Sequence, residues 1–373
     1  MWKNKRRGGE DMQTVTVQIR IFPSNPSVLV NMGNEYIRTV NLLTEQAEAS
    51  GTFPKLTSKN IDANLPSAVK NQLIRDARSI FQKSVKNKKR SILKKRVYYI
   101  NNQNYSIGDD SVSFPACIDG KVQRLVVPAF MAERERNMLA NSKQGLLRVV
   151  QKSNKWFVQV SVEKPTGQAT GTVEMGIDLG LKVPAVVVTS NGKTKFFGNG
   201  RKNKFIRRKY NSRRRKLGKL KKLSAIRKQR DKESRYIKDQ NHKISRQIVT
   251  MAQRENVSVI KLEKLSDIRK TTRTSRKNAK NLQSWSFYQL QQFIAYKSAL
   301  VGIKVMEVNP AYTSQTCPSC GDRNKAKDRM YQCFCGYAAH RDRVGAINIM
   351  RQPVADGVRP RLSAKAVGNS LSA

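Results

Sequence analysis

Residues 312–349 read YTSQTCPSCGDRNKAKDRMYQCFCGYAAHRDRVGAINI, and they carry the strongest fold signal in the chain. Four cysteines occur there as Cys317-x2-Cys320 and, twelve residues later, Cys333-x-Cys335. Two close pairs of thiols are typical of a tetrahedral structural zinc site, in which four sulfur ligands leave no open position for catalysis. We therefore predict a zinc ribbon over residues 313–335. The alternative is a set of reduced, buried cysteines that bind no metal.

Three acidic residues stand at informative places around this window. Asp342 precedes a predicted helix, Glu263 ends the apolar strand VSVIKLE, and Asp178 lies in the strand that opens with GIDLG. The order strand, hairpin, helix, strand, helix, strand predicts an α/β, RNase H-like domain over residues 172–312 and 336–352.

Acids inside apolar strands are costly unless something compensates them. Carboxylates can hold two Mg²⁺ ions about 3.5–4 Å apart for phosphodiester hydrolysis, because magnesium prefers oxygen ligands. We therefore predict that Asp178, Glu263 and Asp342 are catalytic, metal-binding acids. For each acid alone the alternative is a helix cap or an ion pair, and Asp342 also suits the N-cap of the last helix.

The charge balance indicates the class of partner. The chain has 73 Lys plus Arg against 26 Asp plus Glu, a net charge of +47. A polyanion such as nucleic acid would relieve that self-repulsion, since each phosphate contact also releases counterions. A ribosomal or histone-like packing protein is the simpler alternative. No apolar run reaches the roughly 20 residues of a membrane span, and no secretory signal is visible, so we expect a cytoplasmic protein.

The most basic stretch, residues 201–230, contains RRKYNSRRRKLGKLKK and is expected to form part of a long helical hairpin. Its like charges would repel one another unless phosphates lie along them, although a solvated face is the alternative. The candidate nucleic-acid contacts here are Arg207, Arg208, Arg213, Arg214 and Arg215.

The N-terminal third has no catalytic constellation. TVTVQIRIF, residues 14–22, alternates as a half-buried strand does, and later strand pairs flank Asp119-Gly120 and Ser153-Asn154-Lys155. We predict a β-barrel formed by residues 12–30 and 93–165, with a helical insertion at 31–92. The segment 267–281 is expected to be a polar loop and residues 353–373 a disordered tail.

The motifs GIDLG, VIKLEKL, YTSQTCPSCG and CGYAAHRDRVGAINI resemble, in order and spacing, the RuvC-like nuclease domain of the TnpB family. That family comprises RNA-guided DNA endonucleases encoded by insertion sequences, regarded as ancestors of the CRISPR type V effectors. The resemblance is strong over about residues 173–350. One departure is Val344-Gly345, where many members have Asn-Ala.

The resemblance implies a guide RNA, a double-stranded target DNA beside a short adjacent motif, Mg²⁺ at the three acids and Zn²⁺ at the four cysteines. It also implies that the barrel is the family's wedge domain, that the helical insertion is its recognition domain and that the ribbon binds target nucleic acid. LPSAVKNQLIRDA resembles the family helix near the adjacent motif, which makes Lys70, Asn71 and Gln72 candidates for reading it.

Three other functions stay open: a transposase that joins DNA strands, a non-cleaving RNA-guided regulator, and a small CRISPR-associated effector. We expect a monomer that carries one RNA and has no membrane partner.

Overall fold

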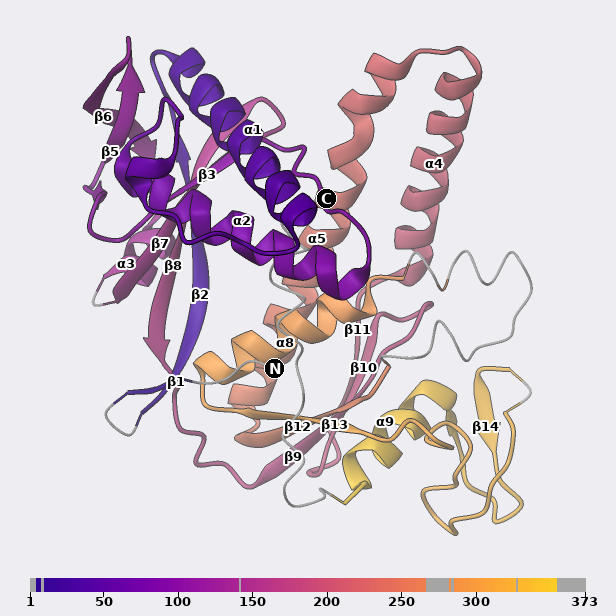
Figure 1. Ribbon diagram of the computed structural model, residues 1–373. Helices are drawn as coiled ribbons and strands as arrows, with labels where there is room; N and C mark the ends of the chain where they lie inside the picture. Colours follow the sequence, from indigo (N-terminus) through magenta and orange to yellow (C-terminus); the bar gives the residue numbers. More distant parts are fainter. Residues whose placement is uncertain are drawn as a thin grey trace. The chain divides into compact units, whose positions relative to one another are not determined.

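Two compact units make up the chain in this computed structural model: Thr14–Lys164 and the remaining residues (Figure 1). The structure describes residues 5–7, 10–140, 142–265, 282, 285–326 and 328–353. The predicted loop 267–281 and the predicted tail beyond Pro353 therefore lie outside the described residues.

The strands of the first unit belong to one sheet with the order β3-β7-β8-β2-β6-β5-β4, and β1, which lies in the Met1–Gln13 segment of the other unit, pairs with the start of β2. The strands are β1 (Lys5–Arg7), β2 (Glu10–Ile21), β3 (Val97–Ile100), β4 (Ser106–Ile107), β5 (Ser111–Ile118), β6 (Lys121–Phe130), β7 (Lys143–Lys152) and β8 (Lys155–Pro165). Both predicted hairpins are confirmed. Asp119-Gly120 joins β5 to β6, and Ser153-Asn154 joins β7 to β8, each with positive φ at both residues, as tight two-residue turns require.

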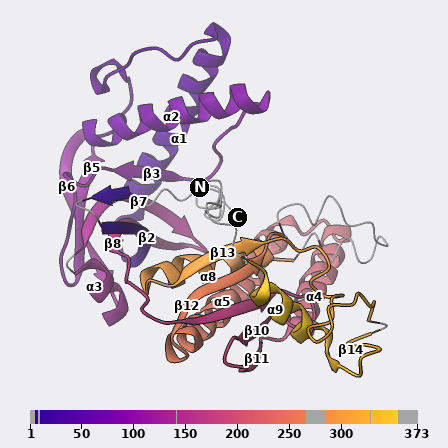
Figure 2. The same cartoon turned by 90° about the horizontal axis from the view of Figure 1, so that it is seen from below.

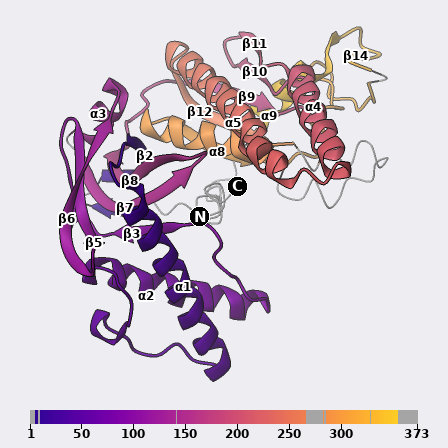
Figure 3. The same ribbon diagram turned by 90° about the horizontal axis from the view of Figure 1, so that it is seen from above.

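Helices α1 (Pro26–Ser50) and α2 (Ser67–Asn87) follow β2 and pack side by side (Figure 3). The short helices η1 (Ser58–Asn60) and α3 (Glu133–Leu139) complete this unit. α1 begins before residue 31, because Pro26 occupies its first turn and the Asn25 side chain accepts a hydrogen bond from the Ser27 N–H. The core of the unit joins the inward face of β2 to these helices through Ile19, Leu29, Tyr36, Val69 and Leu73.

A five-stranded sheet with the order β11-β10-β9-β12-β13 organises the second unit. Its strands are β9 (Val173–Asp178), β10 (Ala185–Thr189), β11 (Thr194–Phe197), β12 (Val257–Glu263) and β13 (Lys304–Val308). The first three strands pair antiparallel, whereas β12 runs parallel to both β9 and β13. The predicted hairpin around Asn191-Gly192 is confirmed as the β10–β11 connection.

Helices cover both faces of this sheet (Figure 2). On β10, Val187 faces α5 (Leu223–Arg254) and α8 (Phe287–Leu300), while Val186 and Val188 face α9 (Arg341–Arg351). α9 comes very close to β9, since a Cβ at Gly176 would lie 2.2 Å from the Ala346 carbonyl oxygen. The basic stretch forms α4 (Gly200–Lys219) and the start of α5, which confirms the predicted helical hairpin. A small sheet of β14 (Met330–Gln332) and β15 (Ala338–His340) precedes α9.

Candidate active site and cysteine cluster

Asp178 and Glu263 occupy the same end of two neighbouring parallel strands. Ile177 of β9 pairs with Leu262 of β12, so the acid that follows each residue lies at the carboxyl end of the sheet. Asp342 joins them from the first turn of α9, the helix that packs against β9 and β10. The structure thus brings the three sequence-predicted acids together from three different elements.

These three acids line one cavity of about 830 Å³. The cavity also has basic and apolar walls; its other lining residues are Leu179, Gly180, Leu181, Lys182, Lys264, Leu265, Leu282, Trp285, Pro310, Thr313, Ser314, Asp328, Arg329 and Arg341. The cavity is large enough for a nucleotide-sized ligand with basic groups for its phosphates.

Mutual repulsion characterises the acids. Burial, and then the charges of Glu263 and Asp342, raise the pKa of Asp178 well above its usual range, although Arg341 and Arg329 oppose this shift. Burial also raises the pKa of Glu263. Carboxylates gathered in this way favour a bound cation, which removes the cost of keeping them charged.

Gly345 on α9 permits the close approach of Asp178 to this helix. A Cβ at position 345 would lie 3.0 Å from Asp178 Oδ2, tighter than most real Cβ contacts. The neighbouring Val344 is fully buried and packs with Cys317, Tyr331 and Cys333. The Val344-Gly345 departure therefore places an apolar residue against the cysteine-bearing segment and a small residue against the acid.

Arg329 is one residue of this site that sequence reasoning missed. Its Nη1 donates to both carboxylate oxygens of Asp342, at 2.8 Å each. The sequence signal was one more arginine between the two cysteine pairs. The fold reveals its partner, because the pairing of β14 with β15 brings Arg329 beside Arg341, whose N–H donates to the Arg329 carbonyl. Asp342 is the next residue along the chain.

The first turn of α9 is capped by His340 and not by Asp342. His340 Nδ1 accepts a hydrogen bond from the Asp342 N–H at 3.3 Å, and its ring packs edge-on against Phe196 at 5.2 Å between centroids. The N-cap alternative for Asp342 is therefore wrong, and its carboxylate faces the cavity and Arg329.

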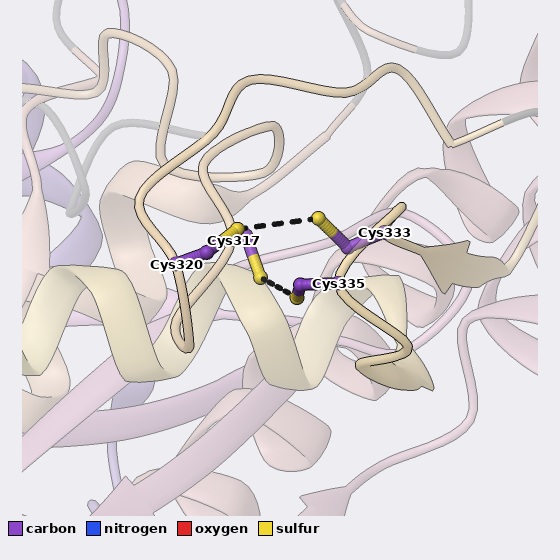
Figure 4. Close-up of side chains that lie close together, drawn as sticks. All are labelled: Cys317, Cys320, Cys333 and Cys335. Atoms are coloured by element: carbon purple, nitrogen blue, oxygen red, sulfur yellow. Dashed lines mark hydrogen bonds between the residues drawn. The ribbon is translucent and has the colours of Figure 1, made fainter.

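The four predicted cysteines meet at one point (Figure 4). Within the described ranges their four sulfur atoms all lie within 4.8 Å of one another. The sulfurs of Cys317 and Cys335 are 3.7 Å apart, and those of Cys320 and Cys333 are 3.4 Å apart. All four are free thiols. Zinc with Zn–S bonds of about 2.3 Å in a tetrahedron requires sulfurs about 3.8 Å apart, so the cluster fits that ion.

Hydrogen bonds favour a thiolate in this cluster. Burial opposes ionisation of Cys317, but the Cys320 and Ser319 N–H groups and the neighbouring thiols lower its pKa to about 6. The Asn324 side-chain N–H also donates to Cys333 Sγ at 3.3 Å. A hydrogen bond to the Asp322 backbone favours the Cys320 thiolate, but the neighbouring thiols instead raise the pKa of Cys320. A bound cation would favour the thiolate form of all four sulfurs.

Family models match two parts of the chain. Residues 157–269 match the model described as "Probable transposase", and residues 287–349 match "Cas12f1-like, TNB domain". A CRISPR-associated endodeoxyribonuclease Cas12f1 of Sulfoacidibacillus thermotolerans is 33% identical over 218 residues, covering 53% of this chain and 50% of the relative. A TnpB-like protein of Methanocaldococcus jannaschii is 35% identical over 124 residues, covering 32% of this chain and 44% of the relative.

The chain belongs to the TnpB family. The matched region spans about half the length of each of these two relatives. The fold is similar to that of the protein in a cryo-EM structure of a Cas12f1–sgRNA–target DNA complex, with a TM-score of 0.64 and 18% identity over 87% of this chain and 81% of that one.

The five candidate arginines of this TnpB-family chain lie in α4, one arm of the α4–α5 hairpin (Figure 1), and they differ in exposure. Arg208, Arg213 and Arg215 are exposed. Arg207 is half-buried, and burial lowers its pKa. Arg214 Nη1 pairs with Glu233 Oε2 at 2.7 Å, so it holds the two helices together.

The three candidates for reading an adjacent motif also differ in their surroundings. Asn71 and Gln72 line a cavity of about 610 Å³ in the first unit, with Arg75, Arg78, Asn101, Asn102 and Gln103 among its other lining residues. Lys70 instead donates from Nζ to the Ile61 carbonyl at 2.9 Å. Among the described residues, no helix has the length and apolar character needed to cross a bilayer.

Proposed function

We propose that this protein is an RNA-guided, divalent-metal-dependent DNA endonuclease that cuts target DNA beside a short adjacent motif. The observation that carries the proposal is the convergence of Asp178, Glu263 and Asp342 in one cavity. Membership of the TnpB family and the net charge of +47 support a nucleic acid as both guide and substrate.

The finer fold assignment is part of the proposal. We assign residues 172–312 and 336–352 to an RNase H-like, RuvC-type nuclease domain, which the mixed sheet order β11-β10-β9-β12-β13 supports. Residues 313–335 are the inserted zinc ribbon, 12–30 and 93–165 the wedge barrel, and 31–92 the recognition insertion.

Mg²⁺ suits the acids because all three offer hard carboxylate oxygens. Two such ions about 3.5–4 Å apart would supply charge neutralisation for attack on a phosphodiester.

Side chains of the cavity have distinct roles in this proposal. Lys182, Lys264 and Arg341 line the cavity and attract the phosphates that flank the cut. Base pairing with the guide reads the target sequence, while the protein holds the duplex through its backbone. The exposed arginines of α4 contact phosphates, and the amides of Asn71 and Gln72 suit the base edges of the adjacent motif.

Zinc at the four cysteines is structural in this proposal. The closed sulfur set leaves no position for a substrate, and its role is to shape the segment that leads to Asp342.

The test is cleavage by the purified protein with its co-purifying RNA, which sequencing identifies. Asp178→Ala is expected to lower the cutting rate about 1000-fold or more while RNA binding persists, because the lost group holds metal and not phosphate. Asp239→Ala is the matched control, since Asp239 is an exposed acid of α5 paired with Lys243. Wild-type cutting by Asp178→Ala would refute the assignment.

A transposase that joins strands is the second candidate, because residues 157–269 match the "Probable transposase" model. It predicts strand-transfer product in the same assay, whereas the endonuclease yields only cut ends. A non-cleaving regulator predicts neither product, and the presence of all three acids in one cavity speaks against it.

A further inference from the structure

The carboxylate of Glu263 accepts a hydrogen bond from one donor among the described residues, the Thr313 hydroxyl. Thr313 Oγ1 lies 2.5 Å from Glu263 Oε1, and Thr313 itself is only 5% exposed. The backbone of Glu263 is held separately, since its carbonyl accepts from Gln291 Nε2 at 2.8 Å. β12 and Gln291 therefore fix the position of the Glu263 backbone, and Thr313 fixes the orientation of the Glu263 carboxylate.

The Thr313 hydroxyl has two acceptors in reach and one proton to donate. The Pro310 carbonyl lies 3.2 Å away, compared with 2.5 Å for the Glu263 carboxylate. A charged acceptor at the shorter distance makes the stronger hydrogen bond, so the proton lies toward Glu263.

The Thr313 backbone is anchored to α9. Asn348 Nδ2 donates to the carbonyls of Thr313 and Thr316, at 2.7 Å each. Tyr331 Oη donates to the Gln315 carbonyl at 3.1 Å. Cys317 follows directly, with its sulfur in the cysteine cluster. Thr313 thus stands at the end of a short segment whose other end is a cluster ligand.

From these contacts we propose that Thr313 is a positioning residue for Glu263, through which the cysteine cluster sets the divalent-metal affinity of the acidic cavity. The inference rests on the proposed function, because it assumes that Glu263 holds a metal ion. Within the described part of the chain Thr313 hydrogen-bonds to the carboxylate of Glu263 and not to that of Asp178, so the coupling through Thr313 acts on Glu263.

The main experiment compares Thr313→Val, which keeps the shape but removes the donor, with Thr313→Ser, which keeps the donor. Mn²⁺ is titrated into the protein–RNA complex and followed by electron paramagnetic resonance. Mn²⁺ binding that is lost in the Asp178→Ala variant is assigned to the acidic cavity. This difference distinguishes it from Mn²⁺ bound to the RNA.

Thr313→Val is expected to weaken Mn²⁺ binding at that site about 10- to 100-fold, as loss of a group that orients a metal ligand does, while Thr313→Ser restores it. Zinc content stays at the wild-type level in both. The control is Thr44→Val in α1, a buried threonine whose hydroxyl bonds only to the Val40 carbonyl in the same helix and should leave Mn²⁺ affinity unchanged.

A second arm tests the route of the coupling. Zinc removal should weaken Mn²⁺ binding by a larger factor in the wild type than in Thr313→Val, because part of the effect of zinc passes through the Thr313 contact that this variant lacks. Wild-type Mn²⁺ affinity in Thr313→Val overturns the positioning role. If zinc removal weakens Mn²⁺ binding by the same factor in Thr313→Val as in the wild type, the two effects are independent and the coupling is overturned. If Asp178→Ala removes neither Mn²⁺ nor cutting, the proposed function fails instead.

Discussion

The cysteine cluster and the acidic cavity both gather groups that become negative when they lose a proton, but they are built differently. Four sulfurs lie within 4.8 Å and come from one short segment. Three carboxylates line a cavity of about 830 Å³ and come from β9, β12 and α9. A closed set of ligands suits a structural ion and an open set suits a reactive one, and experiments can separate the two roles.

The largest effect is expected from Cys320→Ser. Structural zinc contributes an apparent free energy of about 10–16 kcal/mol in small zinc domains, so losing one ligand should release the ion and unfold residues 313–335. Metal analysis and limited proteolysis measure the outcome, and cutting should be lost with the zinc. Cys117→Ser is the control because its sulfur bonds to Asn64, far from the cluster in sequence. Zinc-free wild-type protein would contradict this prediction.

An intermediate effect is expected from Arg329→Ala, which tests the link between the two regions. Without the guanidinium, the Asp342 carboxylate loses both 2.8 Å contacts and is less well oriented. Cutting should fall about 10- to 100-fold while zinc is retained. Arg323→Ala on the same segment, where the guanidinium stacks on Tyr312, should cut normally. Equal rates for the two variants would show that Arg329 has no role in orienting Asp342.

The smallest effect is expected on α4, where the exposed Arg213 can be compared with Arg214, which pairs with Glu233. Arg213 is exposed, so Arg213→Ala should lower the slope of log K against log salt for RNA binding by about 1 and leave thermal stability unchanged. Arg214→Ala should also lower the melting temperature, because it breaks the contact with Glu233. RNA-binding isotherms at several salt concentrations and thermal melts distinguish them; an unchanged slope for Arg213→Ala would exclude a phosphate contact.

Much of the local structure could be predicted from residue spacing. The alternation in residues 14–22 correctly predicts the inward face of β2, and Asp119-Gly120 correctly predicts a tight turn. In α2, Val69, Leu73 and Ala77 recur at helical spacing and are buried, whereas Val85 stands at the same spacing and is 60% exposed. The helix has reached its last turn there and extends past the core it covers.

The candidate site also has one part that the sequence predicts and another part that it does not. Cysteine spacing and the position of each acid at the edge of a strand or helix select the ligand candidates. The hydrogen bonds from Thr313 to Glu263 and from Arg329 to Asp342 carry no sequence signal, because threonine and arginine are common in loops and basic chains. Nor does the sequence separate the exposed Arg213 from Arg214, which pairs with Glu233 of the next helix.

The sequence by itself determined the strands, the hairpin turns, the basic helices and the residue types able to bind metal, since each depends on neighbours within one element. Only the tertiary structure decided that Asp178, Glu263 and Asp342 share a cavity and that Thr313 and Arg329 hold two of them. The physical reason is distance along the chain. Such contacts depend on strand register and on how α9 packs at Gly176 and Gly345, which no local pattern encodes.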